Sequence, residues 1–425
     1  MSRFTAETYQ NEFLPVGAEE VNAVVTVTAD GAAGPVRGTG AAAEIVIIDT
    51  SGSMGMPGAK LRAAMHATGV AIDNLRDGVA FGVIAGTHRA RAIYPHRGLV
   101  AASAETRASA KAAVSELKPG GGTAIGKWLA LANSTFAAHE EAICHAILLT
   151  DGEDRDETPR ELARTLEACK GRFQCDCRGI GTDWLVADLR EVASALLGTV
   201  DIIPEPDALA ADFRAMIEAA MSKETGNVAL RLWTPQGAAV AFVRQVSPVI
   251  EDLTARAADV AAQTVDYPTG AWGREARDYH IAIRVPARAI GDEMLAGRVS
   301  LVVDGQVSGQ SLIRAIWTDD ERLSTQINRE VAHYTGQAEL AAVIQEGLEA
   351  RKAGDGDTAT LKLGRAVQLA ADGGNEATLR LLRNVVDVDD PVTGTVRLRH
   401  DVDVAEEMAL DTRSTKTVRV SGRRP

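Results

Sequence analysis

The chain of 425 residues contains few aromatic residues and fewer basic than acidic ones. Phe, Trp and Tyr together make up 4% of the sequence, so its hydrophobic cores must be built mainly from Ala, Val, Ile and Leu. Lys and Arg number 45 and Asp and Glu 58, which gives a formal net charge of −13. Neutralisation of phosphates supplies most of the affinity of proteins for nucleic acids. The acidic balance therefore argues against a nucleic-acid-binding protein.

Cysteines and long apolar runs are also scarce. Four cysteines are too few for a disulfide scaffold in a chain of this length. The first residues, 1–7, lack the apolar segment of a secretory signal. No run approaches the roughly 18 apolar residues that a membrane-spanning helix needs. These features predict a soluble, cytoplasmic protein without a membrane span, and they leave open export by an unrecognised route.

Strands and helices are predicted to alternate over residues 44–221. The apolar runs 45–48 and 147–149 are continuous, as is typical of strands that are covered on both faces. The pattern predicts a doubly wound, Rossmann-like α/β domain with a parallel sheet and helices on each side. At roughly 150 residues per domain, the chain has room for about three domains.

The rest of the chain has a different pattern of apolar and polar residues. Short β-rich runs separated by turn signals predict an antiparallel β-sandwich over 222–318, and helical periodicity predicts a helical domain over 319–386. Residues 387–425 are polar and are expected to form a flexible tail, with a possible strand at 395–399. The segment 1–43 holds a predicted strand at 22–28 and a Gly/Ala/Pro-rich linker. If that strand belongs to the sandwich, the α/β domain is an insertion within it.

Three loops of the predicted α/β domain carry oxygen-bearing side chains at one edge of the sheet. Asp49, Ser51 and Ser53 directly follow the buried strand 45–48. Thr123 follows a run of three glycines, and Asp151 follows the buried strand that ends at Thr150. Ligands of open α/β sheets bind at the carboxyl ends of the strands. Carboxylate and hydroxyl oxygens are hard ligands, which suit Mg²⁺ or Mn²⁺ rather than Zn²⁺.

This pattern resembles the metal-ion-dependent adhesion site (MIDAS) of von Willebrand factor A domains. That motif reads Asp-x-Ser-x-Ser, then a Thr after a glycine turn, then an Asp-Gly after a later strand. All five positions match, and the resemblance covers roughly residues 40–221. It implies that Asp49, Ser51 and Ser53 contact a divalent ion directly or through water. It also implies that Thr123 contacts the ion directly in one conformation, that Asp151 often acts through water, and that an acidic side chain of a partner completes the shell.

The resemblance implies a metal-dependent protein–protein interaction module that clamps a partner's Asp or Glu through Mg²⁺ or Mn²⁺. An adaptor subunit of an AAA-type ATPase or chelatase-like machine is the main alternative. A metal-dependent hydrolase is a weaker one, because a metal can activate water but no matching general base is evident. No nucleophile–histidine arrangement or paired carboxylates suggest catalysis, so the chain is expected not to be an enzyme.

Other patterns have plainer interpretations. Gly121, Gly126 and Lys127 imitate a phosphate-binding loop, but the next residue is Trp128 rather than Ser or Thr. His139 and His145 are six residues apart, which does not fit a zincin, and we interpret them as isolated histidines. We interpret the cysteines as buried, reduced thiols, while leaving open a zinc or redox site. The cysteines concerned are Cys144, Cys169, Cys175 and Cys177.

Two segments of the chain combine charged residues with more than one possible interpretation. We interpret the acidic run 153–157 as a solvated loop before a helix, which could also tune metal affinity. In the tail, Thr412, Thr415 and Thr417 lie between acidic and basic residues, which makes them candidate phosphorylation sites. The alternatives for the tail are an unmodified segment or a strand that pairs back through Thr417–Val420.

Overall fold

The computed structural model divides the chain into two compact units, one of which is inserted into the other. The described residues are 4–30, 42–56, 58–205 and 208–419. The α/β unit comprises Gly34–Gly226 and Gly270–Gly273, and the β/helical unit comprises Met1–Ala33, Asn227–Thr269 and Arg274–Pro425. Residues 31–41, which make up most of the predicted linker, lie outside the described residues.

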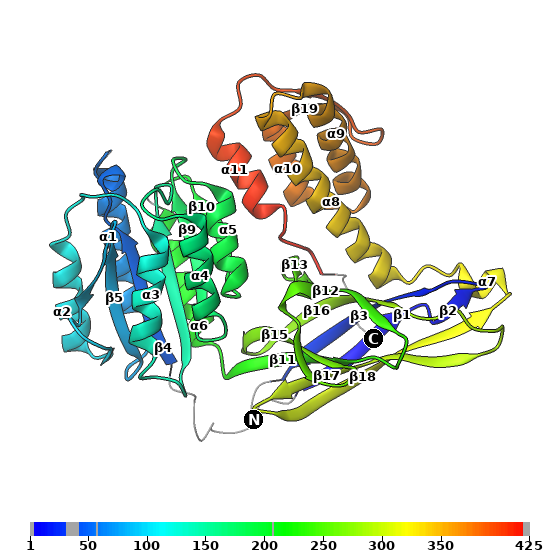
Figure 1. The fold of residues 1–425 in the computed structure, drawn as a ribbon. Coiled ribbons are helices and arrows are strands. Elements are labelled where there is room, and N and C mark those ends of the chain that lie inside the picture. Colours follow the sequence, from blue (N-terminus) through cyan, green and yellow to red (C-terminus); the bar gives the residue numbers. More distant parts are fainter. Residues whose placement is uncertain (1–3, 31–41, 57, 206–207, 420–425) are drawn as a thin grey trace. The chain divides into compact units, whose positions relative to one another are not determined.

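The α/β unit is built on a mostly parallel sheet (Figure 1). Its strand order is β10-β9-β8-β4-β5-β6, in which β6 is antiparallel to β5, and β7 also pairs with β5. The strands are β4 (Ala42–Asp49), β5 (Ala80–Gly86), β6 (Ala90–Tyr94), β7 (Val100–Ala101), β8 (Ile143–Thr150), β9 (Gln174–Ile180) and β10 (Val200–Ile203). The two central strands, β4 and β8, are the continuously apolar runs of the sequence, and they are buried almost throughout.

Helices cover both faces of this sheet, which confirms the predicted doubly wound fold. They are η1 (Gly52–Gly55), α1 (Ala59–Asp73), α2 (Ala104–Ser115), α3 (Ile125–Phe136), α4 (Pro159–Cys169), α5 (Val186–Ala195) and α6 (Leu209–Met221). Val46 and Ile48 of β4 share a core with Leu61 of α1 and Phe213 of α6. Alternate residues of a strand point to opposite faces, so Ile47 faces the other layer of helices.

Two sheets of the β/helical unit face each other, as predicted for a sandwich. The first has the order β1-β3-β16-β12-β13, and the second β14-β15-β11-β17-β18-β2. The first sheet contains β1 (Phe4–Gln10), β3 (Glu20–Ala29), β16 (Glu275–Arg284), β12 (Ala239–Ser247) and β13 (Glu251–Asp252). The second contains β14 (Ala258–Ala261), β15 (Thr264–Trp272), β11 (Thr225–Trp233), β17 (Glu293–Val303), β18 (Gln306–Thr318) and β2 (Phe13–Pro15).

The antiparallel pairs are β1–β3, β3–β16, β16–β12, β12–β13, β14–β15, β11–β17 and β17–β18, whereas β2 is parallel to β18. The two sheets approach closely at Gly297 of β17, where an added Cβ would lie 2.7 Å from Cδ1 of Ile283 of β16. The strand predicted at 22–28 is β3, which lies between β1 and β16. The α/β unit therefore follows β3 in the chain and precedes β11, a strand of the opposite sheet.

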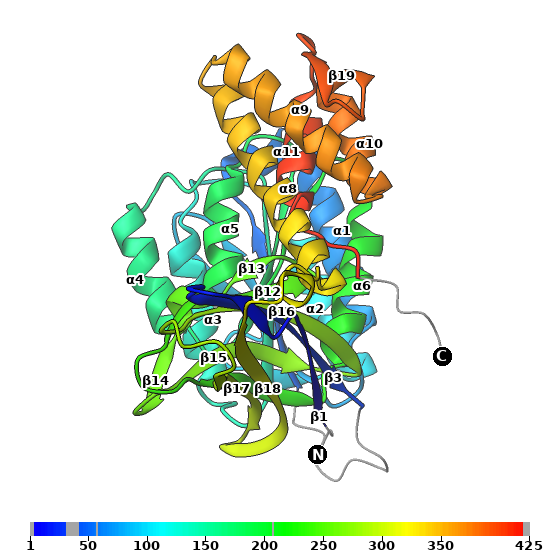
Figure 2. The ribbon, with the colours of Figure 1, turned by 90° about the vertical axis from the view of Figure 1, so that its right-hand side faces the viewer.

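The C-terminal part is helical and continues further than expected (Figure 2). Its elements are α7 (Glu321–Ser324), α8 (Arg329–Lys352), α9 (Gly356–Asp372), α10 (Glu376–Val385), the hairpin β19 (Val386–Asp390) and β20 (Thr395–Leu398), and α11 (Val404–Arg413). Asp355 and Asn375, which interrupt the helical pattern of the sequence, cap the N-termini of α9 and α10. Val396 and Leu410 share a core with Ile344 of α8. The expectation of a flexible tail from residue 387 is therefore wrong for these residues.

The chain after α11 is bound to the first sheet. The N–H of Ile250 donates to the carbonyl of Thr415 (2.8 Å), and the hydroxyl of Thr417 donates to the carbonyl of Val246 (2.6 Å). Thr412 is buried within α11. The three threonines therefore do not form the loose segment that the phosphorylation hypothesis assumed. The chain pairs back at an isolated bridge between Val249 and Lys416, one residue before the strand Thr417–Val420 of the alternative. Residues 417–419 do not form a strand, and Val420 lies outside the described residues.

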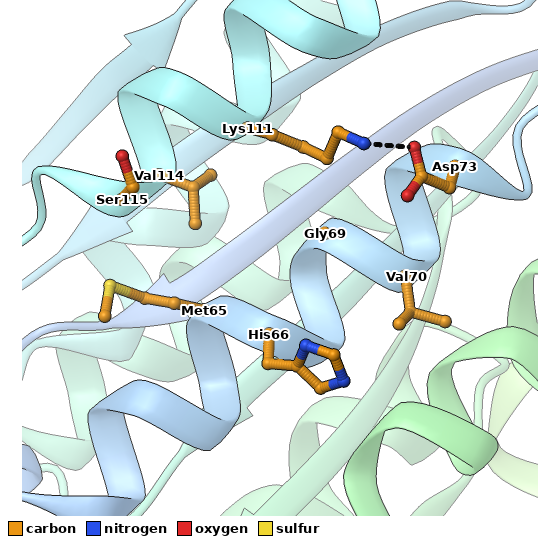
Figure 3. A pocket seen from close by; sticks show the side chains of 8 residues that line it. All are labelled: Met65, His66, Gly69, Val70, Asp73, Lys111, Val114 and Ser115. Atoms are coloured by element: carbon orange, nitrogen blue, oxygen red, sulfur yellow. Dashed lines mark hydrogen bonds and ion pairs between the residues drawn. The ribbon is translucent and has the colours of Figure 1, made fainter.

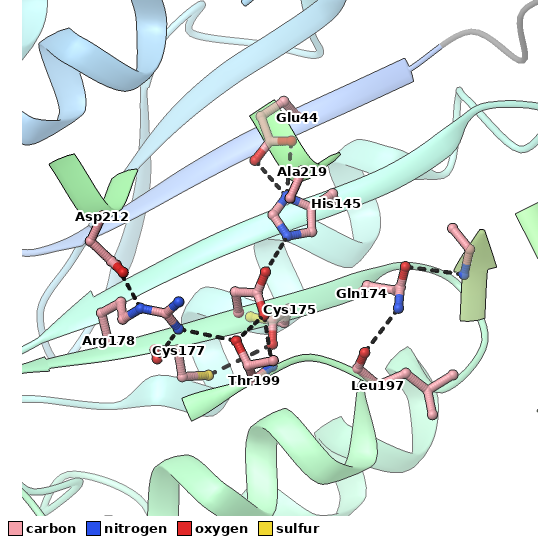
Figure 4. Close-up of polar contacts among 12 residues, drawn as sticks. Glu44, His145, Gln174, Cys175, Cys177, Arg178, Leu197, Thr199, Asp212 and Ala219 are labelled. Carbon is pink, nitrogen blue, oxygen red and sulfur yellow. Dashed lines mark hydrogen bonds and ion pairs between the residues drawn. The ribbon is translucent and has the colours of Figure 1, made fainter. Parts of the chain in front are cut away.

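An ionic network crosses the amino-terminal half of the α/β sheet (Figure 4). His145 of β8 places Nδ1 2.8 Å from Oε1 of Glu44 on β4, and Nε2 3.0 Å from Oδ2 of Asp176 on β9. The interpretation of His145 as an isolated histidine is therefore wrong. Burial alone would lower its pKa, but the two carboxylates outweigh burial and raise the pKa to about 10. The imidazole is thus a buried cation.

All four cysteines are free and buried. Cys175 and Cys177 lie on the same face of β9, and Cys169 is at the end of α4. Burial raises the pKa of Cys144 and of Cys169 to about 11. The thiols of Cys144 and Cys169 are therefore protonated at neutral pH, which makes them poor nucleophiles.

None of the helices within the described ranges is both long and apolar enough to cross a membrane.

We expect His145→Gln to destabilise the α/β unit by about 3–5 kcal/mol, because it leaves two buried carboxylates without their cation. The folded-state pKa of His145, about 10, lies above the ordinary histidine value. Its stabilising contribution is therefore complete below about pH 6.5 and is lost as the pH rises toward 10. Urea unfolding between pH 5.5 and 10 measures this difference, with exposed His66→Gln as the control. A difference that grows with pH would contradict the assignment.

Candidate functional site

The five predicted site residues lie at the carboxyl edge of the α/β sheet. β4 is flanked by β5, which follows it in the chain, and by β8, which comes much later. The connections after β4 and after β8 therefore leave the sheet on either side of a topological switch point. Asp49 is the last residue of β4, and Asp151 directly follows β8. Both carboxylates thus begin loops where α/β proteins characteristically hold ligands.

Asp49 is fully buried, and its two carboxylate oxygens have separate partners. Oδ1 accepts the N–H of Ser51 (2.7 Å), which tightens the turn after β4. Oδ2 accepts the hydroxyl of Thr150 (2.5 Å), the last residue of β8. Burial raises the pKa of Asp49 to about 6, although the hydrogen bonds from Thr150 and Ser51 oppose this shift.

A row of oxygen atoms leads from Ser51 to Asp151. Oγ of Ser51 lies 2.9 Å from Oγ of Ser53, and Ser53 donates to Oδ1 of Asp151 at 2.7 Å. Ser51 is buried, whereas Ser53 is partly exposed. The hydroxyls of the Asp-x-Ser-x-Ser segment therefore face the carboxylate from the neighbouring loop, as the sequence predicts.

The glycine loop brings Thr123 to the same place. Gly120 donates its N–H to the carbonyl of Thr50 (2.8 Å), and Gly52 donates to the carbonyl of Gly121 (2.9 Å). Gly121 has a φ of +82°, which favours glycine. At Gly152 an added Cβ would lie 3.3 Å from Oγ of Ser53 and 3.5 Å from Oγ1 of Thr123. The three loops therefore meet beside Gly152, where a Cβ would be tight against the Ser53 hydroxyl and in ordinary contact with the Thr123 hydroxyl.

Lys60 also belongs to this site, and the sequence analysis missed it. Its Nζ lies 2.8 Å from Oδ2 of Asp151 and 3.0 Å from Oδ2 of Asp183. The Lys60 side chain is 9% exposed. Burial opposes its charge, but hydrogen bonds to the two carboxylates hold its pKa above the ordinary lysine value. Lys60 lies four residues before Ala64 and eight before Thr68, which are both buried in α1. Because residues four apart share a helix face, this spacing could have indicated that Lys60 is buried as well.

The acidic run 153–157 does more than face solvent. The carboxylate of Asp156 accepts the N–H of Thr123 (2.8 Å), and its own N–H donates to the carbonyl of Thr123 (2.9 Å). Glu157 accepts the N–H of Gly126 in the first turn of α3. Burial and the neighbouring Glu157 raise the pKa of Asp154 to about 9. The interpretation of the run as a solvated loop is therefore wrong for Asp154, which is partly buried, whereas Asp156 is exposed as expected and also holds the Thr123 loop.

The donor set at this edge fits a hard divalent cation. Two carboxylates and three hydroxyls converge there, and Mg²⁺ and Mn²⁺ prefer oxygen ligands. Across the part of the chain that the structure describes, no three His, Cys, Asp or Glu residues cluster as a ligand set. A cation at this edge would therefore depend on the hydroxyls of Ser51, Ser53 and Thr123 as well as on Asp49 and Asp151.

Two other features lie apart from this edge. The phosphate-loop-like segment follows helix α2 rather than a strand, and Lys127 donates to the carbonyl of His88 (3.1 Å). A cavity of about 350 Å³ lies between α1 and α2, beside the ion pair of Lys111 with Asp73 (2.6 Å) (Figure 3). None of the five site residues lines this cavity.

Comparisons with known proteins agree with this architecture. A model described as the von Willebrand factor type A domain matches residues 43–202, and one described as the von Willebrand factor type A C-terminal domain matches residues 368–414. The structure is similar to that of a von Willebrand factor type A protein from Catenulispora acidiphila. The TM-score is 0.94 at 52% identity, over 99% of this chain and 98% of that chain.

More distant structures share the fold. The ArnB paralog VWA2 from Sulfolobus acidocaldarius gives a TM-score of 0.59 at 13% identity, over 97% of this chain and 99% of that chain. The human COPII-coat protein Sec24c gives a TM-score of 0.54 at 11% identity, over 89% of this chain and 58% of that chain. None of the curated proteins compared with the chain matches it.

Asp156→Ala tests the support of the Thr123 loop. The substitution removes the acceptor of the Thr123 N–H, and we expect it to cost about 1 kcal/mol in the free energy of unfolding. Glu153→Ala is the matched control, because Glu153 belongs to the same run and bonds only locally, to Arg155 (2.8 Å). That control should change stability by less than about 0.5 kcal/mol. Equal effects of the two substitutions in urea unfolding would contradict a supporting role for Asp156.

Proposed function

Because the chain belongs to the von Willebrand factor type A family, we propose that its α/β unit is a metal-dependent protein-interaction module. One observation carries the proposal: oxygen donors from three separate loops converge at one edge of the sheet. The proposed ligands of Mg²⁺ or Mn²⁺ are Asp49, Ser51, Ser53, Thr123 and Asp151. The partner contributes an Asp or Glu side chain.

Each of these residues has a distinct part in the proposal. Asp49, anchored by Thr150 and by the N–H of Ser51, supplies fixed negative charge at the base of the site. The hydroxyls of Ser51 and Ser53 and the Thr123 hydroxyl supply neutral oxygens, and Asp151 supplies the second charge. A cation bound here would offer the partner's carboxylate an electrophilic position, because Mg²⁺ keeps exchangeable water in protein sites.

The surface around the site supports a protein as the partner. Among the described residues of the α/β unit, the large apolar side chains that are exposed are Met56, at 82%, and Leu185, at 48%. Met56 lies in the loop after β4, and Leu185 in the loop after β9. Both therefore lie at the edge that carries the site, and methionine is enriched in protein interfaces.

We assign binding rather than catalysis to this site. Both carboxylates already accept hydrogen bonds from groups of the chain itself: Asp49 from Thr150, and Asp151 from Ser53 and Lys60. Neither is therefore presented as a general base toward a bound water.

Asp49→Asn tests this function, because the amide keeps the size of the side chain and removes its charge. We expect calorimetric titration to show binding of Mg²⁺ and Mn²⁺ by the wild type and at least about a hundredfold weaker binding by the variant. In affinity capture from the source organism with Mg²⁺ present, a partner should be retained by the wild type and released by EDTA. The Asn variant should not retain it.

Lys111→Met is the control for the capture experiment, since it removes an exposed lysine and its ion pair with Asp73 without touching the site. It should retain the partner like the wild type. A folded wild type that binds neither cation would overturn the proposal. So would a partner that stays bound in EDTA and binds the Asp49 variant equally well.

A further inference from the structure

We propose that Lys60 is an internal cation of the metal site, which competes with the divalent ion for Asp151 and so keeps the intrinsic affinity for that ion low. This inference rests on the proposed function, because it concerns the same site. It goes further by naming a residue outside the five predicted ligands and giving it a regulatory charge.

The position of the ammonium group is fixed by the structure. Nζ of Lys60 lies 2.8 Å from Oδ2 of Asp151 and 3.0 Å from Oδ2 of Asp183. A Cβ added to Gly181 would lie 3.4 Å from Cε and 3.6 Å from Nζ of Lys60. The end of the side chain is therefore enclosed between the loop after β8 and the loop after β9.

Both carboxylate oxygens of Asp151 already accept a hydrogen bond in this arrangement. Its Oδ2 accepts Lys60, and its Oδ1 accepts the hydroxyl of Ser53 (2.7 Å). The carboxylate is completely buried, so water does not compete for these oxygens. A divalent ion that used Asp151 would have to share this carboxylate with the ammonium group.

The balance of charge points the same way. Asp49 and Asp151 carry two negative charges, which would neutralise a divalent ion. The buried Lys60 adds one positive charge, so a loaded site carries an excess of one. Asp183 forms an ion pair with Lys60 at 3.0 Å, but its side chain is 69% exposed, so water weakens this pair and Asp183 offsets the excess only in part. Repulsion between Lys60 and a bound ion is screened far less, because Lys60 and Asp151 are buried.

Two substitutions separate charge from positioning. Lys60→Met removes the charge and the hydrogen bonds, whereas Lys60→Gln removes the charge and keeps a donor for Asp151. If the charge of Lys60 weakens binding, calorimetric titration with MgCl₂ and MnCl₂ should show at least about tenfold tighter binding by both variants. The rise in melting temperature on adding Mg²⁺ should also be larger for both, because the ion replaces a missing cation beside Asp151. Lys111→Met should match the wild type in both measurements.

The outcomes distinguish this inference from the proposed function. If the folded wild type binds neither cation, the proposed function fails, whatever the Lys60 variants do. If the wild type binds and both variants bind equally or more weakly, the inference about Lys60 is overturned and the metal site stands. Weaker binding by the Met variant with unchanged binding by the Gln variant would assign Lys60 a positioning role instead. The Gln variant decides the question if the Met variant does not fold.

Discussion

The hydrogen bond from the Thr150 hydroxyl to the carboxylate of Asp49 joins the ends of the two central strands, and the candidate site depends on it. β4 and β8 are neighbours in the sheet, but the described chain between them contributes three α-helices, the short 3₁₀ helix η1 and three strands. The bond links the last residue of β4 to the last residue of β8, next to the loops that carry Ser51, Ser53 and Asp151. Burial excludes water from this contact, which makes the anchor stronger than it would be at the surface.

The sequence predicts the backbone of the site better than its electrostatics. The apolar runs mark β4 and β8, and the ends of those strands fix where the next residues lie. Asp49 and Asp151 could therefore be placed at the carboxyl edge of the sheet without a structure. Lys60 and Asp156 could not, because their partners are distant in sequence. Lys60 reaches Asp151 across 91 positions, and Asp156 reaches Thr123 across 33. A charged residue in a helix or loop is usually solvated. Only the fold shows that Lys60 is buried and that Asp156, although exposed, accepts the N–H of Thr123.

The same limit explains the errors elsewhere. No short motif marks the partners of His145. They are the carboxylates of Glu44 on β4 and Asp176 on β9, which approach His145 only when the sheet forms. The segment after residue 386 is polar enough to suggest disorder, yet a few apolar residues are sufficient to dock it. Leu410 and Val396 complete a core whose other members lie in α8, α9 and α10 and at Val386, the first residue of β19. Mean polarity predicts poorly where a short segment covers a core that is already largely formed.

The insertion of the α/β unit has a topological consequence for the whole chain. The main stretch of the unit, Gly34–Gly226, is connected to the β/helical unit after β3 and before β11, and these strands belong to opposite sheets. The short stretch Gly270–Gly273, at the end of β15, also belongs to the α/β unit. Both β3 and β11 are interior strands, hydrogen-bonded on both sides: β3 by β1 and β16, and β11 by β15 and β17. A force on the α/β unit would therefore reach the β/helical unit through strands of both of its sheets. Cleavage of either connection alone would leave the two units covalently joined.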